Sequence, residues 1–200
     1  MLSTPASPSI AFRSAIPEDC AHLVLFADMA TRCLTSFLWS RMAEPGQSTG
    51  EIGRSIIRND EAHFTHFKNW RIALHQGQII GGLNCYILPD MSGMTTDIEA
   101  VRPLNALKAI AAGSWYISSA AIYQEYQGKG CGRALIAEAE SLARSAGRSK
   151  LTLMVNSHNK RAHKLYLAVG FQDWERRPFI PFPGSDKPGD WILMVKDLSA

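Results

Sequence analysis

The residues best suited to chemistry form a glycine-rich segment that stands directly before a stretch with helical periodicity. The first turn of a helix leaves backbone N–H groups without partners, and the helix dipole makes that end positive. Such a turn can hold a phosphate, because alternating glycines bring no Cβ between the anion and the backbone. Lys129 and Arg133 add positive charge. The segment predicts an anion-binding turn, with a tight turn that holds no ligand as the alternative; it reads Gln127-Gly128-Lys129-Gly130-Cys131-Gly132-Arg133.

Two other phosphate-binding glycine loops do not fit this segment. A Walker loop needs Ser or Thr after its lysine, but Lys129 is followed by Gly130. A dinucleotide fingerprint starting at Gly128 needs a third glycine where Arg133 stands, and an acid at the end of the next strand. No acid follows that strand until Asp173. Both readings are excluded.

The elements on either side of the glycine segment are predicted from periodicity and turn residues. A strand over Trp115–Ile122 leads into it, and a helix over Arg133–Ala146 follows it. A buried-type strand over Leu151–Val155 and a helix over Lys160–Val169 come next. The chain then predicts a final antiparallel pair, over Phe171–Arg176 and Trp191–Val195. The glycines thus lie at a strand-to-helix junction.

The N-terminal half predicts more helix and one hairpin. Pro17-Glu18-Asp19 favours a helix start, and Leu23–Trp39 predicts one long helix or two short ones. Further expectations are a strand at Ile10–Arg13, a helix at Gly50–Asn59, a hairpin of Trp70–Leu74 with Ile79–Leu88, and a helix near Pro103–Ala112 inside the irregular stretch Pro89–Gly113. We therefore expect an α/β (α+β) fold with a mixed sheet: a loose tail over residues 1–8 and one domain over residues 9–200.

Two motifs in the C-terminal half resemble those of one protein family. Gln127-x-x-Gly130-x-Gly132 resembles the acetyl-CoA motif of the GNAT superfamily of N-acetyltransferases. Trp115–Tyr123 is similar to the family's fourth strand, and the segment Asn159-x-x-Ala162-x-x-x-Tyr166-x-x-x-Gly170-Phe171 is similar to its later signature helix. The resemblance is specific from Trp115 to Phe171, and before that only the order of elements agrees.

The resemblance implies that acetyl-CoA is the co-substrate and binds where the fourth and fifth strands splay apart. Backbone groups of Ala120, Ala121 and Ile122 would then pair with the pantetheine arm like an added strand. The amides from Gln127 to Gly132 would take the pyrophosphate, and Asn159 would contact the pantetheine or phosphate region. Asn159 is also suited to cap a helix, and both roles are compatible.

The resemblance also proposes catalytic groups. Tyr166 matches the family's usual general acid, which stabilises or protonates the departing thiolate; the alternative is a core tyrosine. Where several relatives carry a carboxylate base on the fourth strand, this chain has Ser118. We expect Glu99 or Asp97 to serve instead, directly or through water, although both also suit solvated loop acids. The resemblance also implies that the aromatic and Met-containing stretch Phe37–Met42, with Trp39, and the stretch Pro89–Gly113 flank the substrate mouth; both could equally serve as packing.

Composition limits the remaining classes of function. A hydrophobic share of 46% and a charged share of 20% are typical of a globular domain. No apolar run could cross a bilayer, no signal peptide is apparent, and four scattered cysteines suggest neither disulfides nor a metal site. The net charge of +3 does not argue for nucleic acid, although Gln127–Lys164 holds eight Lys/Arg against two acids. We expect a cytoplasmic enzyme that acetylates a small-molecule or peptide amine, and a homodimer is compatible with this expectation. The alternative is a non-catalytic acyl-CoA-binding or sensor domain.

Overall fold

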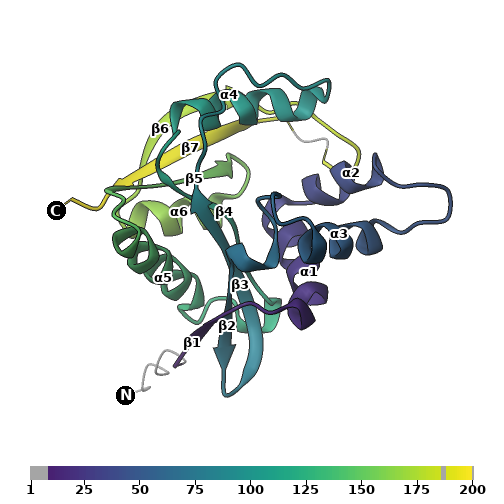
Figure 1. Ribbon diagram of the computed structural model, residues 1–200. Coiled ribbons are helices and arrows are strands. Elements are labelled where there is room, and N and C mark those ends of the chain that lie inside the picture. The colour runs from purple at the N-terminus through teal and green to yellow at the C-terminus, as the bar shows by residue number, and fades with distance from the viewer. Residues whose placement is uncertain (1–8, 186–187, 200) are drawn as a thin grey trace.

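A mixed seven-stranded sheet forms the centre of the molecule, in the order β1-β2-β3-β4-β5-β7-β6 (Figure 1). The computed structural model describes residues 9–185 and 188–199, so the tail expected over residues 1–8 lies outside the described residues. All neighbouring strands pair antiparallel except β4 and β5, which are parallel. The strands are β1 Ala11–Ser14, β2 Trp70–His75, β3 Gln78–Ile87, β4 Trp115–Ile122, β5 Lys150–Asn156, β6 Gln172–Pro178 and β7 Asp190–Asp197.

The helices agree with the sequence expectations to within a few residues. They are α1 Cys20–Thr31, α2 Leu34–Ser40, α3 Thr49–Asn59, α4 Arg102–Ile110, α5 Cys131–Ser145 and α6 Lys160–Ala168. The hairpin between β2 and β3 turns at Gln76 and Gly77, whose φ angles are 50° and 79°, as a two-residue hairpin turn requires. Within the described residues, no helix is long and apolar enough to span a bilayer.

The apolar run over Leu23–Trp39 forms two helices because the chain bends at Arg32 and Cys33. Both residues have left-handed backbone, with φ of 53° and 71°. Side chains of α1 satisfy the amides that the break exposes. The Thr31 hydroxyl accepts from the Thr35 amide at 3.1 Å, and the Asp28 carboxylate accepts from the Ser36 amide at 3.1 Å. The second helix is therefore fixed at a set angle to the first.

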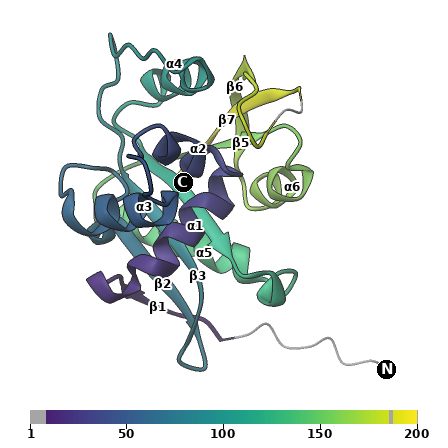
Figure 2. The same ribbon diagram turned by 90° about the vertical axis from the view of Figure 1, so that its right-hand side faces the viewer.

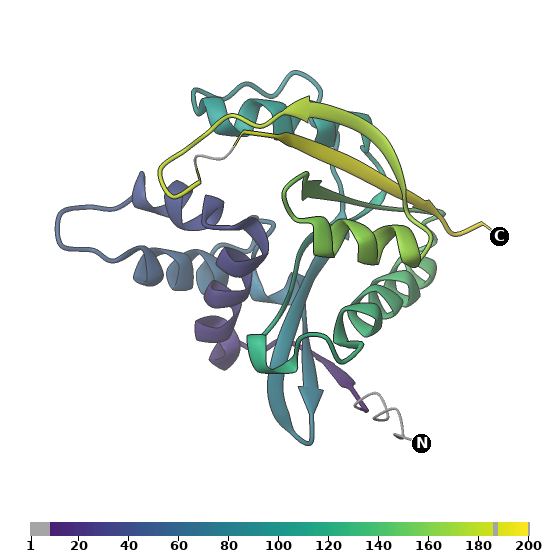
Figure 3. The ribbon, with the colours of Figure 1, turned by 180° about the vertical axis from the view of Figure 1, so that it is seen from behind.

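Helices cover both faces of the sheet, and the alternation of side chains along each strand supplies both cores. On β2, Ile72 belongs to the cluster beneath α1 and α3, whereas Ala73 belongs to the cluster beneath α5. On β4, Tyr116 packs towards α4 and Ile117 packs towards α5. Figures 1 and 3 show α5 and α6 on one side of the sheet and α1, α2 and α3 on the other.

The sheet opens between β4 and β5, as the sequence resemblance predicted. Their pairing covers only Trp115–Ile117 against Leu151–Leu153. Beyond it both strands continue without pairing with each other. A β-bulge lies at this point, because Asn84 pairs with Ser119 while Cys85 pairs with Ile117, leaving Ser118 as the extra residue. Bulges re-aim side chains and increase local twist, and here the bulge stands where the strands separate.

A buried hydrogen-bond cluster fixes the segment before β2 to the sheet. Asn84 is fully buried, and its amide nitrogen donates to the carbonyls of Phe64 at 3.1 Å and Asn69 at 3.2 Å. The indole N–H of Trp70 donates to the Thr65 carbonyl at 2.9 Å. These bonds position the segment that lines a cavity together with residues of α2 and α4. Figure 2 shows α1, α2 and α3 in front of the sheet on this side of the molecule.

We predict that Asn84→Ala lowers the free energy of unfolding by about 2 kcal/mol, since it removes two buried hydrogen bonds. Urea denaturation of the purified chain measures this change. The control is Asn59→Ala, at an exposed position where the amide makes one long contact with Ser55 at 3.4 Å. Equal losses in both variants would contradict the anchoring role of Asn84.

Candidate active site

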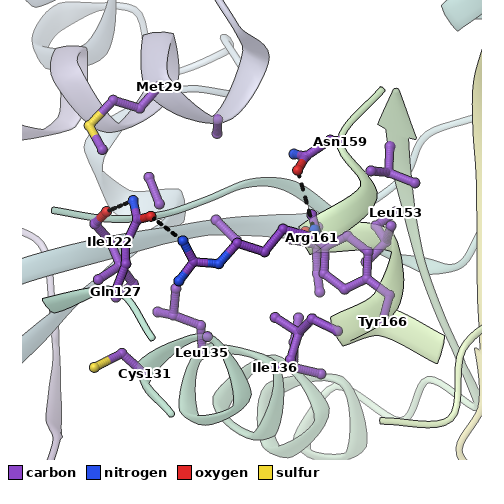
Figure 4. Close-up of a pocket in the computed structure, with 18 of the residues that line it drawn as sticks. Met29, Ile122, Gln127, Cys131, Leu135, Ile136, Leu153, Asn159, Arg161 and Tyr166 are labelled. Carbon is purple, nitrogen blue, oxygen red and sulfur yellow. Dashed lines mark hydrogen bonds between the residues drawn. The ribbon is translucent and has the colours of Figure 1, made fainter. Parts of the chain in front are cut away.

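A cavity of about 460 Å³ lies in the opening between β4 and β5 (Figure 4). One wall is the free edge of β4, including Ser118 and Ala120–Ile122, and the facing wall is Leu153–Asn156 of β5. The glycine turn and the start of α6 close one end, and Met29 of α1 and Arg32, which follows that helix, add a further wall. The cavity is of the size that small-molecule and cofactor sites have.

The glycine turn presents backbone donors to this cavity. Gly128 and Gly130 have φ of 81° and 86°, which residues with a Cβ adopt only at a cost. Gly130 is the N-cap of α5, and its carbonyl accepts from the amides of Arg133 and Ala134. Within the described residues, no group accepts a hydrogen bond from the amides of residues 128–132. They lie at the positive end of a helix.

Gln127 and Arg161 brace the turn from the side. The amide nitrogen of Gln127 donates to the Ile122 carbonyl at 2.9 Å, and its oxygen accepts from Arg161 at 3.0 Å. Figure 4 shows the Arg161 side chain extended from α6 across the cavity towards Gln127. The first residue of the glycine motif thus links β4, the turn and α6.

The cations around the cavity differ from those the sequence suggested. Arg133 lines it as expected, but Lys129 is exposed and places its ammonium 5.6 Å from the ring centroid of Tyr126. Arg161 and Arg32 line the cavity as well, and no Asp or Glu is among its described lining residues. The cavity is therefore a site of positive potential, built partly by helices outside the glycine motif.

Asn159 and Cys131 have clear structural roles beside their places in the cavity lining. Asn159 caps α6, since its side-chain oxygen accepts from the Ala162 amide at 3.2 Å. Cys131 is 1% exposed and belongs to the core between α5 and the sheet. Asn159 can still offer its amide nitrogen to a ligand, whereas Cys131 acts by packing.

Tyr166 lines the cavity from α6 and is half-buried. Its ring packs against Phe171, with centroids 5.8 Å apart. Burial raises the pKa of its phenol to about 12, because the phenolate would lose hydration there. The phenol is thus protonated at neutral pH and can donate a hydrogen bond into the cavity.

The structure does not bring Glu99 to the cavity. Its side chain is 72% exposed, and its carboxylate lies 3.8 Å from Arg102. Ala100 and Leu104 turn inwards from the same segment, which leaves Glu99 facing solvent. Asp97 is exposed as well. The expectation that either acid reaches the reacting atoms has no support in this geometry.

A second cavity of about 480 Å³ adjoins the first, and its lining includes Leu38 and several residues of the stretch Pro89–Gly113. The two share four lining residues, among them Ser118 of the bulge. The walls of the second come from α2, residues 62–65 and the segment from Pro89 to α4. Trp39, expected near a substrate mouth, is instead buried against Gly53 of α3, where the missing side chain makes room for the indole. The shared residues are Ala30, Ser118, Met154 and Trp191.

Comparison with known proteins identifies the family of this chain. Residues 34–171, more than half of the chain, match the model of the acetyltransferase (GNAT) family. The chain belongs to this family. The matched region contains the glycine turn, the β4–β5 opening and Tyr166. The family resemblance inferred from the motifs is confirmed.

Individual relatives are similar to this chain in part of its sequence or in its fold. The chain is 41% identical over 58 residues to an uncharacterized N-acetyltransferase, YycN, of Bacillus subtilis. That match covers 29% of this chain and only 37% of the relative. The fold is similar to ribosomal-protein-S18-alanine N-acetyltransferase of Escherichia coli (TM-score 0.60, 17% identity, 96% of each chain). It is also similar to yncA of Salmonella typhimurium, solved with acetyl-CoA (TM-score 0.59, 16% identity, 96% of this chain and 95% of that one).

We predict that Gly130→Ala destabilises the fold by about 1–2 kcal/mol, because alanine is strained at a left-handed position. The matched control is Gly50→Ala in α3, where an added Cβ meets open space and the backbone is not left-handed. There alanine should stabilise the helix by about 0.5 kcal/mol. Urea denaturation gives both values. A destabilisation of the Gly50 variant as large as that of the Gly130 variant would contradict this view of the turn.

Proposed function

We propose that this protein is an N-acetyltransferase that moves the acetyl group of acetyl-CoA directly to an amine. The observation that carries the proposal is the row of amides at residues 128–132, which have no acceptor within the described residues and open onto a cationic cavity. A diphosphate would satisfy these donors together and would be held by the helix dipole of α5. The guanidinium of Arg161 would add a charge-assisted hydrogen bond.

The rest of the cofactor would lie along β4. The edge of β4 from Ser118 to Ile122 faces β5 without pairing, so its backbone donors and acceptors suit the amide groups of pantetheine. Ala120, Ala121 and Ile122 line the cavity along this edge. If the cofactor runs along β4 from the glycine turn, its thioester would lie near Ser118, where the two cavities meet.

The amine substrate would then bind in the second cavity. Its nitrogen attacks the thioester carbonyl, the new C–N bond forms, and the C–S bond breaks to release the thiolate. With a pKa of about 12, Tyr166 is a far weaker acid than a thiol near 8.5. Full proton transfer to sulfur would be uphill, so the phenol stabilises the thiolate by donating a hydrogen bond.

The amine must be in its neutral form when it attacks the thioester carbonyl. The strand position of the family carboxylate is Ser118, and neither cavity has an Asp or Glu among its described lining residues. We propose that the ammonium form of the acceptor loses its proton to water before attack. The proton that the nitrogen loses after attack also reaches solvent, and the thiolate is protonated there. A cytoplasmic location and a homodimer stay predictions from the sequence.

Calorimetric titration with CoA tests the diphosphate site. We predict that Arg161→Met weakens CoA binding about tenfold or more, because a charge-assisted hydrogen bond is lost. Binding of pantetheine, which has no diphosphate, should be unchanged. Arg54→Met, at an exposed position of α3 outside both cavities, serves as the control. If the wild-type chain does not bind CoA, the proposed function is wrong.

Turnover tests the role of Tyr166. We predict that Tyr166→Phe lowers kcat about tenfold to a hundredfold, since the thiolate loses its hydrogen bond, while CoA affinity changes little. Release of free thiol from acetyl-CoA measures the rate. Tyr123→Phe is the matched control, because the Tyr123 hydroxyl bonds His22 at 2.7 Å outside both cavities. An unchanged kcat in the Tyr166 variant would assign this residue to the core.

A further inference from the structure

The second cavity has a charge pattern that a simple amine does not explain. Its walls are mainly apolar, with Leu34 and Leu38 from α2, Leu104 from α4, and Met91 and Met94 before it. No Asp or Glu is among its described lining residues. A site for a diamine or a polyamine would need carboxylates to hold the second ammonium group, because a buried charge without a partner is costly. This cavity has none.

The cavity instead contains an ammonium group of its own. Lys108 projects from α4, with its nitrogen 5.2 Å from the ring centroid of Phe64 and 5.9 Å from that of Tyr116. Among the described residues, no carboxylate lies within ion-pair distance of it. The aromatic faces replace part of the hydration that the ammonium loses on burial. They leave it without a counter-charge.

Burial acts on the protonation state of Lys108 without removing its charge at neutral pH. It lowers the pKa of the ammonium to about 8, so the group is still mostly cationic at pH 7. A bound anion would supply the missing partner and raise this pKa again. The side chain is therefore suited to hold a negatively charged ligand group in an otherwise apolar cavity.

His63, on the facing wall, adds a hydrogen-bond donor. The Thr65 amide donates to its Nδ1 at 3.2 Å, which places the proton of the neutral ring on Nε2. Burial lowers the pKa of His63; the Asp60 carboxylate opposes this by a smaller amount, and the charge of Lys108 lowers the pKa again, so the net shift is downward. The ring is thus neutral at pH 7 with Nδ1 already engaged. It can donate to an anion but offers no free nitrogen as a base.

We propose that the second cavity binds an acceptor that carries a carboxylate and an apolar side chain beside its amine, with the carboxylate at Lys108. This inference rests on the proposed function. A volume of about 480 Å³ suits a molecule of amino-acid size. Since Ser118 and Met154 line both cavities, the amine of such a molecule would face the thioester while its carboxylate stays at the α4 wall.

Matched acceptors test the carboxylate. Leucine, methionine, phenylalanine and tryptophan would each be compared with the corresponding carboxamide, using thiol release from acetyl-CoA. We expect at least one acid to exceed its carboxamide in kcat/KM by about tenfold to a hundredfold, as a charge-assisted hydrogen bond would give. If the carboxamides are used as well as the acids, or better, the inference is wrong while the proposed function stands.

Substitution of the lysine assigns the effect to a residue. Lys108→Met keeps the apolar stem and removes the charge, so kcat/KM for the preferred acid should fall about tenfold or more while that for its carboxamide stays within twofold. Lys150→Met is the matched control: its ammonium also lies over a ring, 5.4 Å from the Trp174 centroid, but outside both cavities. Equal losses for acid and carboxamide in the Lys108 variant would overturn the inference.

A binding measurement separates this inference from catalysis. Calorimetric titration with the N-acetyl derivatives of the same four amino acids and of their carboxamides needs no turnover. We expect an N-acetyl acid to bind the wild-type chain at least tenfold more tightly than its carboxamide, and Lys108→Met to abolish the difference. No preference for any of the acids would overturn the inference even if CoA binds, whereas a preference without CoA binding would overturn only the proposed function.

Discussion

The architecture of the site depends on the point where β4 loses its parallel neighbour. Up to Ile117 the two strands share a hydrogen-bond ladder, and from Ser118 onward β4 has an unpaired edge inside the molecule. Buried backbone groups without partners are costly, so this edge is either hydrated or occupied by a ligand. The bulge at Ser118 stands at the separation, and the first and second cavities adjoin there.

Helices on both faces keep this opening in place. The core under α5 uses one set of alternating side chains from the sheet, and the cores under α1, α3 and α4 use the other. The glycine turn lies between β4 and α5, so neither can shift without changing the orientation of the free amides. Gln127 adds a direct link, because it bonds both the β4 backbone and Arg161 of α6.

Local patterns predicted the C-terminal half well, because its strands, helices and glycine turn are specified by adjacent residues. The contributions of Arg32 and Arg161 were not foreseen, since they arise from helix packing that no short motif encodes. Glu99 has the chemical type of a general base, but its side chain faces solvent, because the neighbouring apolar residues occupy the inward positions. The second cavity combines α2, α4 and residues 62–65, and only the three-dimensional arrangement shows that Lys108 has no acidic neighbour among the described residues.

The two cavities draw on different stretches of the chain. The first cavity is built mainly by one stretch, from Ile117 to Tyr166, with α1 as an added wall. The second cavity depends largely on α2 and on the segment from Pro89 to Lys108. Substitutions in that second group can therefore change the second cavity during evolution while the glycine turn stays intact. If the proposed function holds, one scaffold can in this way accept new amines while it keeps its site for the acyl donor.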